Sequence, residues 1–556
     1  MDSSRPTPFT FRGGRESAEA GETLLQHLAR RGLPSLQRSI RYHRPRAPFC
    51  GIGHCTNCLV RVNGEPNVRA CRYVPRSGDA VTTTNAWPSP QYDLMGLIDV
   101  VFPRGLDILH GFRRPAWATP LFQRVVRRLS GYGPVATATA STPPVTTPAI
   151  DLDVLVIGAG PAGRQASQRL AQGGRSVGLL DRGSIPAPPE GVPLFPSTTA
   201  VFLPPPPARG DRPFELVALE EPDRGRLFRA HTVVVASGAY DASLLFTGND
   251  RPGVMTAEGA LAMAPGDRAP PFRRALIVGG GARAAEMMDR FGVHTEAVVA
   301  PGSISPEVTR RASELSVALY PRTLLVSASG RGRVRRVWLV PRGRGPEFSV
   351  PVDAVLLAHR RLPNSQLLFQ AGAQMEWRGT AGSFFPVLGG GSRTTVPGLF
   401  AIGEAAGFDD GVAAEASALA AADAILGREV PPPSVRTPDT PNELVGYYRE
   451  LLRFPTGLGK QVVCPCEDVL LREVREAVER GYRGLEVVKR YTGLGTGLCQ
   501  GRYCLPDVLL ILSILEERSA SEIGYIRQRP PVVPTPLSAF AELPEPAPEI
   551  PVPEKA

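Results

Sequence analysis

The segment "CGIGHCTNCLVRVNGEPNVRAC", from Cys50 to Cys71, decides how this sequence of 556 residues is interpreted. It holds four of the eight cysteines, spaced C-x4-C-x2-C with the fourth after 12 more residues. This is the plant-type spacing of [2Fe–2S] sites, and two glycines let the loop wrap so that backbone N–H groups point at the sulfurs. Zinc is the weaker alternative, because its cysteine ligands usually come in C-x2-C pairs. The predicted metal ligands are Cys50, Cys55, Cys58 and Cys71.

The residues around this segment predict a β-grasp ferredoxin fold. Asn63-Gly64 is a hairpin turn signal between two apolar runs, and it brings Cys71 back toward the loop. Upstream, "FTFRG…GETLLQHLARRG" indicates a hairpin followed by a helix. We therefore expect residues 1–100 to form an N-terminal [2Fe–2S] ferredoxin-like domain.

The other four cysteines lie near the C-terminus, in "VVCPCEDV" and "TGLGTGLCQGRYC". A C-x-C pair, an interval of 32 residues and a C-x4-C pair resemble the [2Fe–2S] site of the bacterioferritin-associated ferredoxin (BFD-like) type. Glycine-rich turns and basic residues suit an anionic cluster, while a zinc ribbon is the alternative. With this second set, all eight cysteines are assigned, four to each site. The second set also predicts a small domain over 436–530. Its ligands are Cys464, Cys466, Cys499 and Cys504.

A dinucleotide-binding turn follows a strand in "DVLVIGAGPAG". Glycines in this pattern allow a tight turn and close approach of the backbone to a pyrophosphate, which the next helix N-terminus stabilises. A second strand ends at Asp181, about twenty residues on, where a carboxylate accepts hydrogen bonds from a ribose. The predicted cofactor-binding residues here are Gly158, Gly160, Pro161, Ala162, Gly163, Asp181 and Arg182.

A second turn, "RALIVGGGARAAEMMDRFG", carries Gly279 and Gly281, with Ala284 in place of the third glycine. Its following strand, "TEAVVAPG", ends in Pro301 without an acid. NAD at this turn and an inserted domain that keeps the fold without the ligand both stay open.

Two further segments resemble FAD motifs of two-dinucleotide flavoproteins. "VVVASGAYD" contributes Ser237 and Gly238, and "VPGLFAIGEAAG" contributes Gly403 and Glu404, where aspartate is usual. The segment after Asp181, "RGSIPAPPEGVPLFPS", replaces the usual glycine-rich loop, so ATP or NAD in place of FAD is an alternative. No cysteine lies between Asp181 and Val430, which excludes a disulfide reductase.

The order of these motifs predicts an α/β protein of several domains. A flavoprotein with two Rossmann-like dinucleotide-binding domains is expected over 151–435, with the second nucleotide domain inserted at about 272–350. The connector and its Ser/Thr/Pro linker occupy 101–150, and a Pro-rich tail occupies 531–556.

Composition excludes several function classes. The net charge of +10 comes almost entirely from arginine, since the chain has only three lysines, and no aromatic-basic interleaving indicates nucleic-acid binding. No apolar run reaches the roughly 18 residues of a membrane span, and "LPDVLLILSILEE" (Leu505–Glu517) is expected to be a buried helix. The N-terminus lacks the apolar core of a signal peptide. A cytoplasmic protein with reduced thiols is therefore expected.

Over nearly its whole length the chain resembles the alpha-type subunits of heteromeric sarcosine oxidase, proline and hydroxyproline dehydrogenases, opine oxidase and hydrogen cyanide synthase. "YHRPRAPFCGIGHCTNC" (Tyr42–Cys58) resembles the small [2Fe–2S] ferredoxin subunit of that group, here fused at the N-terminus. "FTGNDRPGVMTAEGALAM" (Phe246–Met263) and "RQRPPVVPTPLSAF" (Arg527–Phe540) also match. The folate-binding half of the sarcosine oxidase alpha subunit has no counterpart, so chemistry coupled to tetrahydrofolate is not expected.

The resemblance implies an electron-transfer flavo-iron–sulfur subunit of an amino-acid or imino-acid dehydrogenase or oxidase. A beta-type subunit with its own FAD oxidises the amine, FMN binds at the partner interface, and a quinone, protein or dye accepts the electrons. No catalytic residue is identified, because His43, His54, His110 and His359 are isolated. The alternatives are a stand-alone NAD(P)H-dependent ferredoxin-type reductase and a non-catalytic scaffold that binds ATP or NAD.

Overall fold

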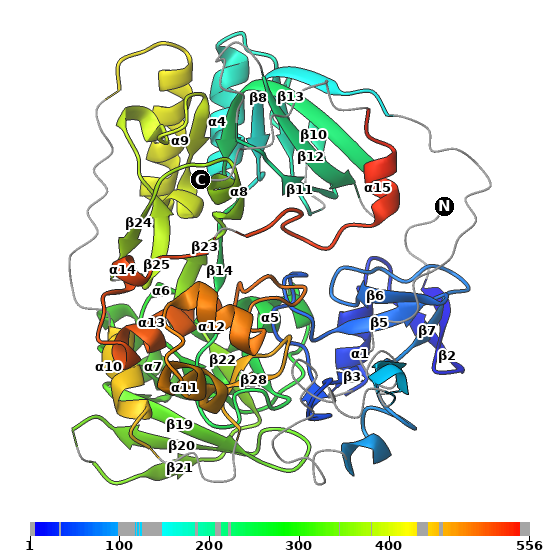
Figure 1. Cartoon of the computed structure of the whole chain (residues 1–556), viewed down its shortest axis with the longest axis vertical. Helices are drawn as coiled ribbons and strands as arrows, with labels where there is room; N and C mark the ends of the chain where they lie inside the picture. The colour runs from blue at the N-terminus through cyan, green and yellow to red at the C-terminus, as the bar shows by residue number, and fades with distance from the viewer. Residues whose placement is uncertain are drawn as a thin grey trace.

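The computed structural model describes residues 6–32, 35–97, 117, 119–121, 123–124, 147–183, 187–205, 213–220, 224–343, 345–379, 381–430, 443–454, 460–526 and 528–544. Most of the expected connector and linker, and the tail beyond residue 544, lie outside these ranges. Figure 1 shows two stacked sheet regions with the N-terminal domain beside the lower one and C-terminal helices packed in front of it.

The N-terminal domain is the β-grasp fold that the sequence predicts. Thr23 caps helix α1 (Leu24–Arg30) in a capping box with Gln26. The sheet packs its apolar face on α1 and has the strand order β2-β1-β7-β5-β6. Its strands are β1 (Thr7–Phe11), β2 (Gly14–Ala18), β5 (Leu59–Val62), β6 (Glu65–Arg69) and β7 (Ala80–Thr82). A separate two-stranded hairpin pairs β3 (Gln37–Arg38) with β4 (Pro45–Arg46), and a 3-10 turn, η1 (Leu94–Gly96), follows.

The first dinucleotide sheet is parallel around β8 and antiparallel at one edge. Its order is β10-β9-β8-β13-β12-β11, with β26 (Leu399–Ala401) paired to β13. Buried Val and Leu residues fill its central strands, and α4 (Pro161–Gln172) packs against α9 (Gly411–Ile425) on one face. The strands are β8 (Ile150–Ile157), β9 (Val177–Leu180), β10 (Leu194–Phe195), β11 (Thr198–Phe202), β12 (Phe214–Glu220) and β13 (Arg224–Val235).

The second sheet is entirely parallel, in the order β15-β22-β16-β17-β18. It uses residues from 254 to 357, so it extends beyond both ends of the range 272–350 expected for the inserted domain. Its strands are β15 (Val254–Thr256), β16 (Ala275–Val278), β17 (Thr295–Val299), β18 (Ala318–Tyr320) and β22 (Ala354–Leu357). Its helices are α5 (Ala257–Met263), α6 (Ala282–Phe291) and α7 (Pro306–Leu315), with η3 (Gly292–His294) after α6.

Short antiparallel elements join and border the two sheets. The pair β14 and β23 connects the two nucleotide regions, and the pair β24 and β25 lies near it (Figure 1). The strands are β14 (Ala239–Asp241), β19 (Thr323–Ser329), β20 (Arg336–Pro341), β21 (Phe348–Val350), β23 (Arg361–Pro363), β24 (Met375–Arg378) and β25 (Ser383–Pro386). Three short helices belong to the same part of the chain: α8 (Gln366–Gln370), η4 (Gly390–Ser392) and η5 (Gly403–Ala406).

The C-terminal domain is helical around its cysteines. Helix α13 (Leu505–Leu515) is buried along its first eight residues, as its apolar sequence predicts. Within the described residues no helix is long and apolar enough to cross a membrane. After α13 the chain returns to the first sheet, where α15 (Leu537–Ala541) packs on β13 (Figure 1). The remaining elements are α10 (Glu443–Leu451), β27 (Val462–Cys464), β28 (Val469–Leu470), α11 (Leu471–Glu479), α12 (Leu485–Thr492) and α14 (Ala520–Ile523).

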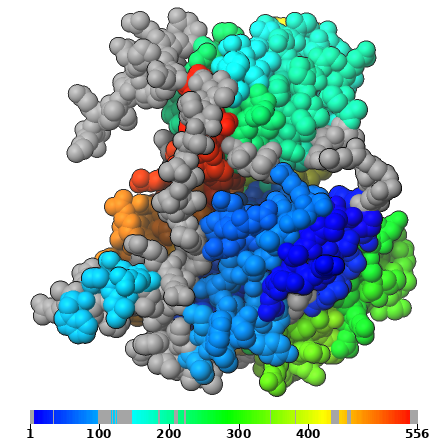
Figure 2. Space-filling view, turned by 90° about the vertical axis from the view of Figure 1, so that its right-hand side faces the viewer, coloured from blue at the N-terminus to red at the C-terminus, as the bar shows by residue number. Residues whose placement is uncertain are grey.

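The domains share their cores. Cys50 and Cys55 belong to the same buried apolar cluster as the four C-terminal cysteines and the second sheet. Cys58 and Cys71 belong to a cluster that joins the β-grasp sheet to α5 and α6. Figure 2 shows the N-terminal domain lying below the first dinucleotide sheet and beside the second. The packing therefore places both cysteine loops in the interior, between the sheets.

Candidate functional site

The N-terminal cysteines converge in two pairs. The loop Cys50–Cys58 follows β4, Cys71 follows β6, and all four thiols are buried. Cys50 contacts Cys55, and Cys58 contacts Cys71. The backbone N–H of Cys55 donates to Cys50 Sγ at 3.3 Å.

Hydrogen bonds also set the ionisation of this loop. Burial raises the pKa of Cys50, but hydrogen bonds from Cys55 and from the backbone at Ile52 and His54 lower it to about 5. The loop thus surrounds a thiolate with N–H donors, as its glycine-containing sequence predicts.

The C-terminal cysteines repeat this pairing. Cys464 ends β27 and contacts Cys504, which precedes α13, while Cys466 contacts Cys499. All four are buried. The contact with Cys499 lowers the pKa of Cys466 to about 6 despite burial, and the Thr56 hydroxyl and the Arg46 charge also lower it.

Two pairs of thiols suit a binuclear cluster. Four thiolates hold a [2Fe–2S] cluster, two on each iron, whereas a zinc ribbon places four ligands around a single ion. The two-and-two grouping therefore fits the iron–sulfur expectation at both sites, and the eight ligands stay a prediction.

The first dinucleotide turn has the close packing that its glycines allow. A Cβ on Gly158, whose φ is +109°, would overlap the carbonyl oxygen of Ala236, and one on Gly163 would overlap that of Gly158. Gly160, Pro161, Ala162 and Gly163 form the start of α4. At the end of β9, Asp181 accepts hydrogen bonds from the backbone N–H groups of Ala159 at 2.8 Å and Gly183 at 2.7 Å. Because a carboxylate has about four acceptor positions, Asp181 keeps capacity for ribose hydroxyls.

A cavity of about 660 Å³ opens beside this turn. Its wall includes the first dinucleotide turn, Ile52–His54 of the N-terminal cysteine loop, residues of β6 and β11, and Arg502 of the C-terminal cysteine segment. Its lining includes Gly158, Asp181, Arg182, Ser237, Gly53, His54 and Arg502. The nucleotide region, the N-terminal cysteine loop and Arg502, which lies between Cys499 and Cys504, therefore border one space, although none of the eight cysteines is among its lining residues.

His54, which lines this cavity, carries a buried ring nitrogen without a partner among the described residues. Arg182 Nη1 lies 2.6 Å from its Nε2, and since a guanidinium only donates, Nε2 is the acceptor. Burial and the charges of Arg502 and Arg182 lower the pKa of His54 well below its usual range, so the ring is neutral with its proton on Nδ1. That Nδ1 is buried and has no partner within the described residues.

The later FAD motifs meet each other beside the cavity. Glu404, in η5, is paired with Arg361 of β23, and its Oε2 lies 3.6 Å from where a Cβ on Gly238 would stand. Arg361 also reaches Glu258 of α5 at 3.3 Å. Gly238 and Glu404, with their chain neighbours Ser237 and Gly403, thus lie close together, and sequence reasoning missed Arg361, the partner of Glu404.

The substitution Glu258→Gln tests whether the buried carboxyl of Glu258, next to Arg361, is protonated at neutral pH. Burial and the neighbouring Asp241 raise the pKa of Glu258 from 4.5 to about 7. The protonated form is favoured in the folded state, so its contribution to stability is complete below about pH 4.5 and is lost as the pH rises through 7. Raising the pH from 5 to 8 should lower the free energy of unfolding of the wild type more than that of Glu258→Gln, measured by urea unfolding.

The control for this experiment is Glu286→Gln, which removes a half-exposed carboxylate paired with Arg283. The free energy of unfolding of Glu286→Gln should change with pH as that of the wild type does. A Glu258→Gln variant with the wild-type pH dependence would contradict the assignment.

The second dinucleotide turn stays apart from this cavity. Gly279 and Gly281 precede α6 in the second sheet, and neither lines the space described above. The segment after β17 packs on the turn, because the N–H of Ser305 donates to the carbonyl of Gly280 at 2.8 Å. NAD binding at this turn remains a prediction.

Comparison with known proteins agrees with this arrangement. Three families match: the 2Fe-2S iron-sulfur cluster binding domain over residues 4–86, pyridine nucleotide-disulphide oxidoreductase over 208–423, and the sarcosine oxidase A3 domain over 458–542. The alpha subunit of sarcosine oxidase from Rhizobium meliloti (strain 1021) is 28% identical over 97% of this chain and 58% of its own length. An opine oxidase subunit from Agrobacterium tumefaciens (strain Ach5) is 27% identical over 71% of this chain and 92% of its own length.

The resemblance to the alpha-type subunits is confirmed. The chain spans little more than half the length of the sarcosine oxidase subunit that it matches. The crystal structure of L-proline dehydrogenase from P. horikoshii has the same fold, with a TM-score of 0.66 and 20% identity over 97% of this chain and 98% of that one. The predicted fold class, an N-terminal ferredoxin domain followed by a Rossmann-like flavoprotein and a small C-terminal domain, is likewise confirmed, and an iron–sulfur cluster and FAD are the groups that these families support.

Several residues at the junction of the domains were not predicted. Arg44 and Arg46 of the "YHRPRAPFC" segment contact the "CPCED" segment more than 400 positions away. Both segments stand out in the sequence for their cysteines, and nothing in either indicates the other as a partner. Thr56, between Cys55 and Cys58, is a further contact of this kind.

Proposed function

We propose that this chain is the electron-transfer subunit of a heteromeric amino-acid or imino-acid dehydrogenase or oxidase. In this proposal a beta-type subunit with its own FAD removes a hydride from a C–N bond, and a quinone, another protein or a dye is the final acceptor. FMN at the interface with that partner is part of the same proposal. Sarcosine oxidase and opine oxidase relatives named as subunits support a heteromeric assembly.

One observation carries the proposal: a single cavity is lined by the dinucleotide turn, by Ile52–His54 of the N-terminal cysteine loop and by Arg502, between Cys499 and Cys504. His54 and Arg182 bridge the N-terminal loop to the end of β9 at 2.6 Å. Arg502, beside Cys504, lines the same space. This proximity supports electron transfer between a bound nucleotide cofactor and the cysteine sites.

The residues present suit three bound groups. Cys50, Cys55, Cys58 and Cys71 would hold one [2Fe–2S] cluster, and the four C-terminal cysteines would hold another. Gly158 and Asp181 would hold FAD by its pyrophosphate and ribose. When bound, a flavin accepts electrons in pairs and iron–sulfur clusters pass them singly. A cytoplasmic location, where thiols stay reduced, suits eight free cysteines.

Iron and acid-labile sulfide per chain, with EPR spectra after dithionite, test this proposal on anaerobically purified protein. We expect about four irons, four sulfides and two distinct EPR signals. Nucleotide released by denaturation should be FAD. Zinc in place of iron, or ATP in place of FAD, would contradict the electron-transfer role.

Turnover assays separate this function from a stand-alone reductase. The chain should co-purify with a flavoprotein partner, and amine oxidation should need that partner. Rapid bleaching of the flavin by NADH, or amine turnover by this chain alone, would overturn the proposal.

A further inference from the structure

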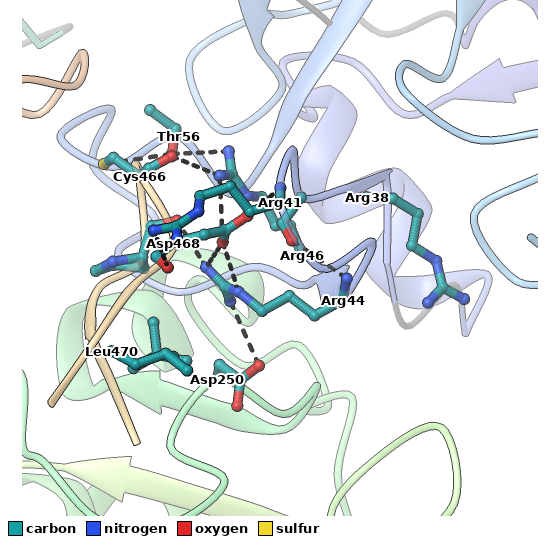
Figure 3. Close-up of polar contacts among 12 residues, drawn as sticks. Arg38, Arg41, Arg44, Arg46, Thr56, Asp250, Cys466, Asp468 and Leu470 are labelled. Carbon is teal, nitrogen blue, oxygen red and sulfur yellow. Dashed lines mark hydrogen bonds and ion pairs between the residues drawn. The ribbon is translucent and has the colours of Figure 1, made fainter. Parts of the chain in front are cut away.

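The two cysteine sites touch through one hydroxyl group. Thr56 lies between Cys55 and Cys58 in the N-terminal loop, and its Oγ1 is 3.4 Å from Cys466 Sγ in the C-terminal set. Thr56 and Cys466 are both about 1% exposed. Figure 3 shows the threonine and the cysteine side by side, although 410 positions separate them in the sequence.

Arg46 fixes the direction of this hydrogen bond. Its Nη1 lies 3.3 Å from Thr56 Oγ1. A guanidinium has donors only, so the threonine oxygen accepts from Arg46 and its single proton is left for the sulfur. Arg46 Nη2 also donates to the carbonyl of Cys466 at 2.6 Å. One guanidinium therefore orients the hydroxyl and holds the backbone of the cysteine that receives the proton.

A buried ion pair fixes the position of the N-terminal "YHRPRAPFC" segment relative to the "CPCED" segment. The segment between β3 and β4 supplies Arg44, whose Nη2 lies 2.6 Å from Asp468 Oδ1 and donates to the carbonyl of Pro465 at 2.7 Å. The backbone N–H of Arg41 donates to Asp468 Oδ2 at 2.9 Å (Figure 3). Asp468 has no exposed surface. These contacts fix the "CPCED" turn against the N-terminal domain, so Thr56 has a defined position relative to Cys466.

We propose that Thr56 is a positioning residue by which the N-terminal cysteine loop raises the reduction potential of the C-terminal [2Fe–2S] site. The inference rests on the proposed function. Hydrogen bonds to cluster sulfurs help to set the potentials of iron–sulfur centres. A donor to the ligand sulfur stabilises the reduced, more negative state, because hydrogen bonds strengthen as the acceptor gains negative charge.

Thr56→Val tests the proposal, since valine keeps the shape of threonine and lacks its hydroxyl. The full-length protein is titrated anaerobically and followed by EPR, with the C-terminal signal assigned from its loss in Cys466→Ser. At a fixed potential, the ratio of reduced to oxidised C-terminal site should fall about tenfold, which is about 59 mV for one electron. The N-terminal signal should keep its midpoint, and Thr56→Ser should keep the wild-type ratio.

Thr323→Val is the matched control, because Thr323 is buried and its hydroxyl donates to the backbone carbonyl of Pro321. This variant should titrate as the wild type. Thr56→Ala removes the same hydroxyl without adding a methyl group and should reproduce the fall if the valine variant does not fold.

Four results would overturn the inference. An unchanged C-terminal midpoint in Thr56→Val and Thr56→Ala would show that the hydroxyl does not act on the site. Equal shifts of both signals, or a shift in Thr323→Val, would show a general effect of the substitution. Absence of iron from the wild-type C-terminal set would overturn the proposed function as well, and the iron content of the wild type distinguishes that failure from the others.

Discussion

Asp468→Ala should lower the free energy of unfolding by about 3–5 kcal/mol, the cost of breaking a buried ion pair on one side. The carboxylate lies 2.6 Å from Arg44 and 3.8 Å from Arg46, and both guanidinium groups are about 5% exposed. Alanine would leave the buried Arg46 without this carboxylate and would leave Arg44 with only the longer contact to Asp250, at 3.5 Å. Urea unfolding of the anaerobic full-length protein measures the change through the transition midpoint.

The control for this substitution is Asp423→Ala. Asp423 also pairs with two arginines, Arg169 at 3.0 Å and Arg428 at 2.6 Å, but it lies at the surface. Asp423→Ala should lower the free energy of unfolding by less than about 1 kcal/mol, because solvent screens exposed ion pairs. Equal losses in the two variants would contradict the role of the buried pair.

The stabilisation by Asp468 should be lost at low pH. Burial raises the pKa of Asp468, but the charges of Arg44 and Arg46 lower it by more than burial raises it. The pKa of Asp468 therefore lies below the ordinary value of 3.8. A depressed carboxyl pKa contributes stability above the ordinary value that is lost as the pH falls through the folded one. The difference in free energy of unfolding between the wild type and Asp468→Ala should therefore become smaller as the pH is lowered below about 4.

Cys466→Ser should remove one of the two expected EPR signals and about half of the iron, from about four to about two atoms per chain. Cys466 is buried and paired with Cys499, and each cluster needs its four thiolates. Serine keeps the size of the side chain but is a poor ligand for this iron. Iron and sulfide analysis of the anaerobically purified variant, with EPR after dithionite, measures the loss.

Cys55→Ser is the reciprocal control in the N-terminal set. It should remove the other signal and leave the one that Cys466→Ser loses. Loss of both signals in either variant would indicate that the two sites do not form independently. Loss of neither would show that these residues are not ligands.

Local sequence patterns predicted the individual elements well. The hairpin at Asn63-Gly64 lies between β5 and β6, and the upstream segment forms the strands β1 and β2 and the helix α1. The first glycine turn follows β8 and begins α4. Turn chemistry, strand composition and glycine spacing act within about thirty residues, so they can be recognised without knowing the rest of the fold.

The sequence by itself determined the two cysteine sets, the β-grasp and dinucleotide elements and the resemblance to alpha-type subunits, because each depends on residues close together in the chain. Only the tertiary structure decided that Thr56 meets Cys466, that Asp468 pairs with Arg44, and that His54 and Arg502 share a cavity with Gly158. These contacts join residues that lie 100 to more than 400 positions apart. No periodicity or spacing encodes them, since they arise from how the apolar faces of separate domains pack into common cores.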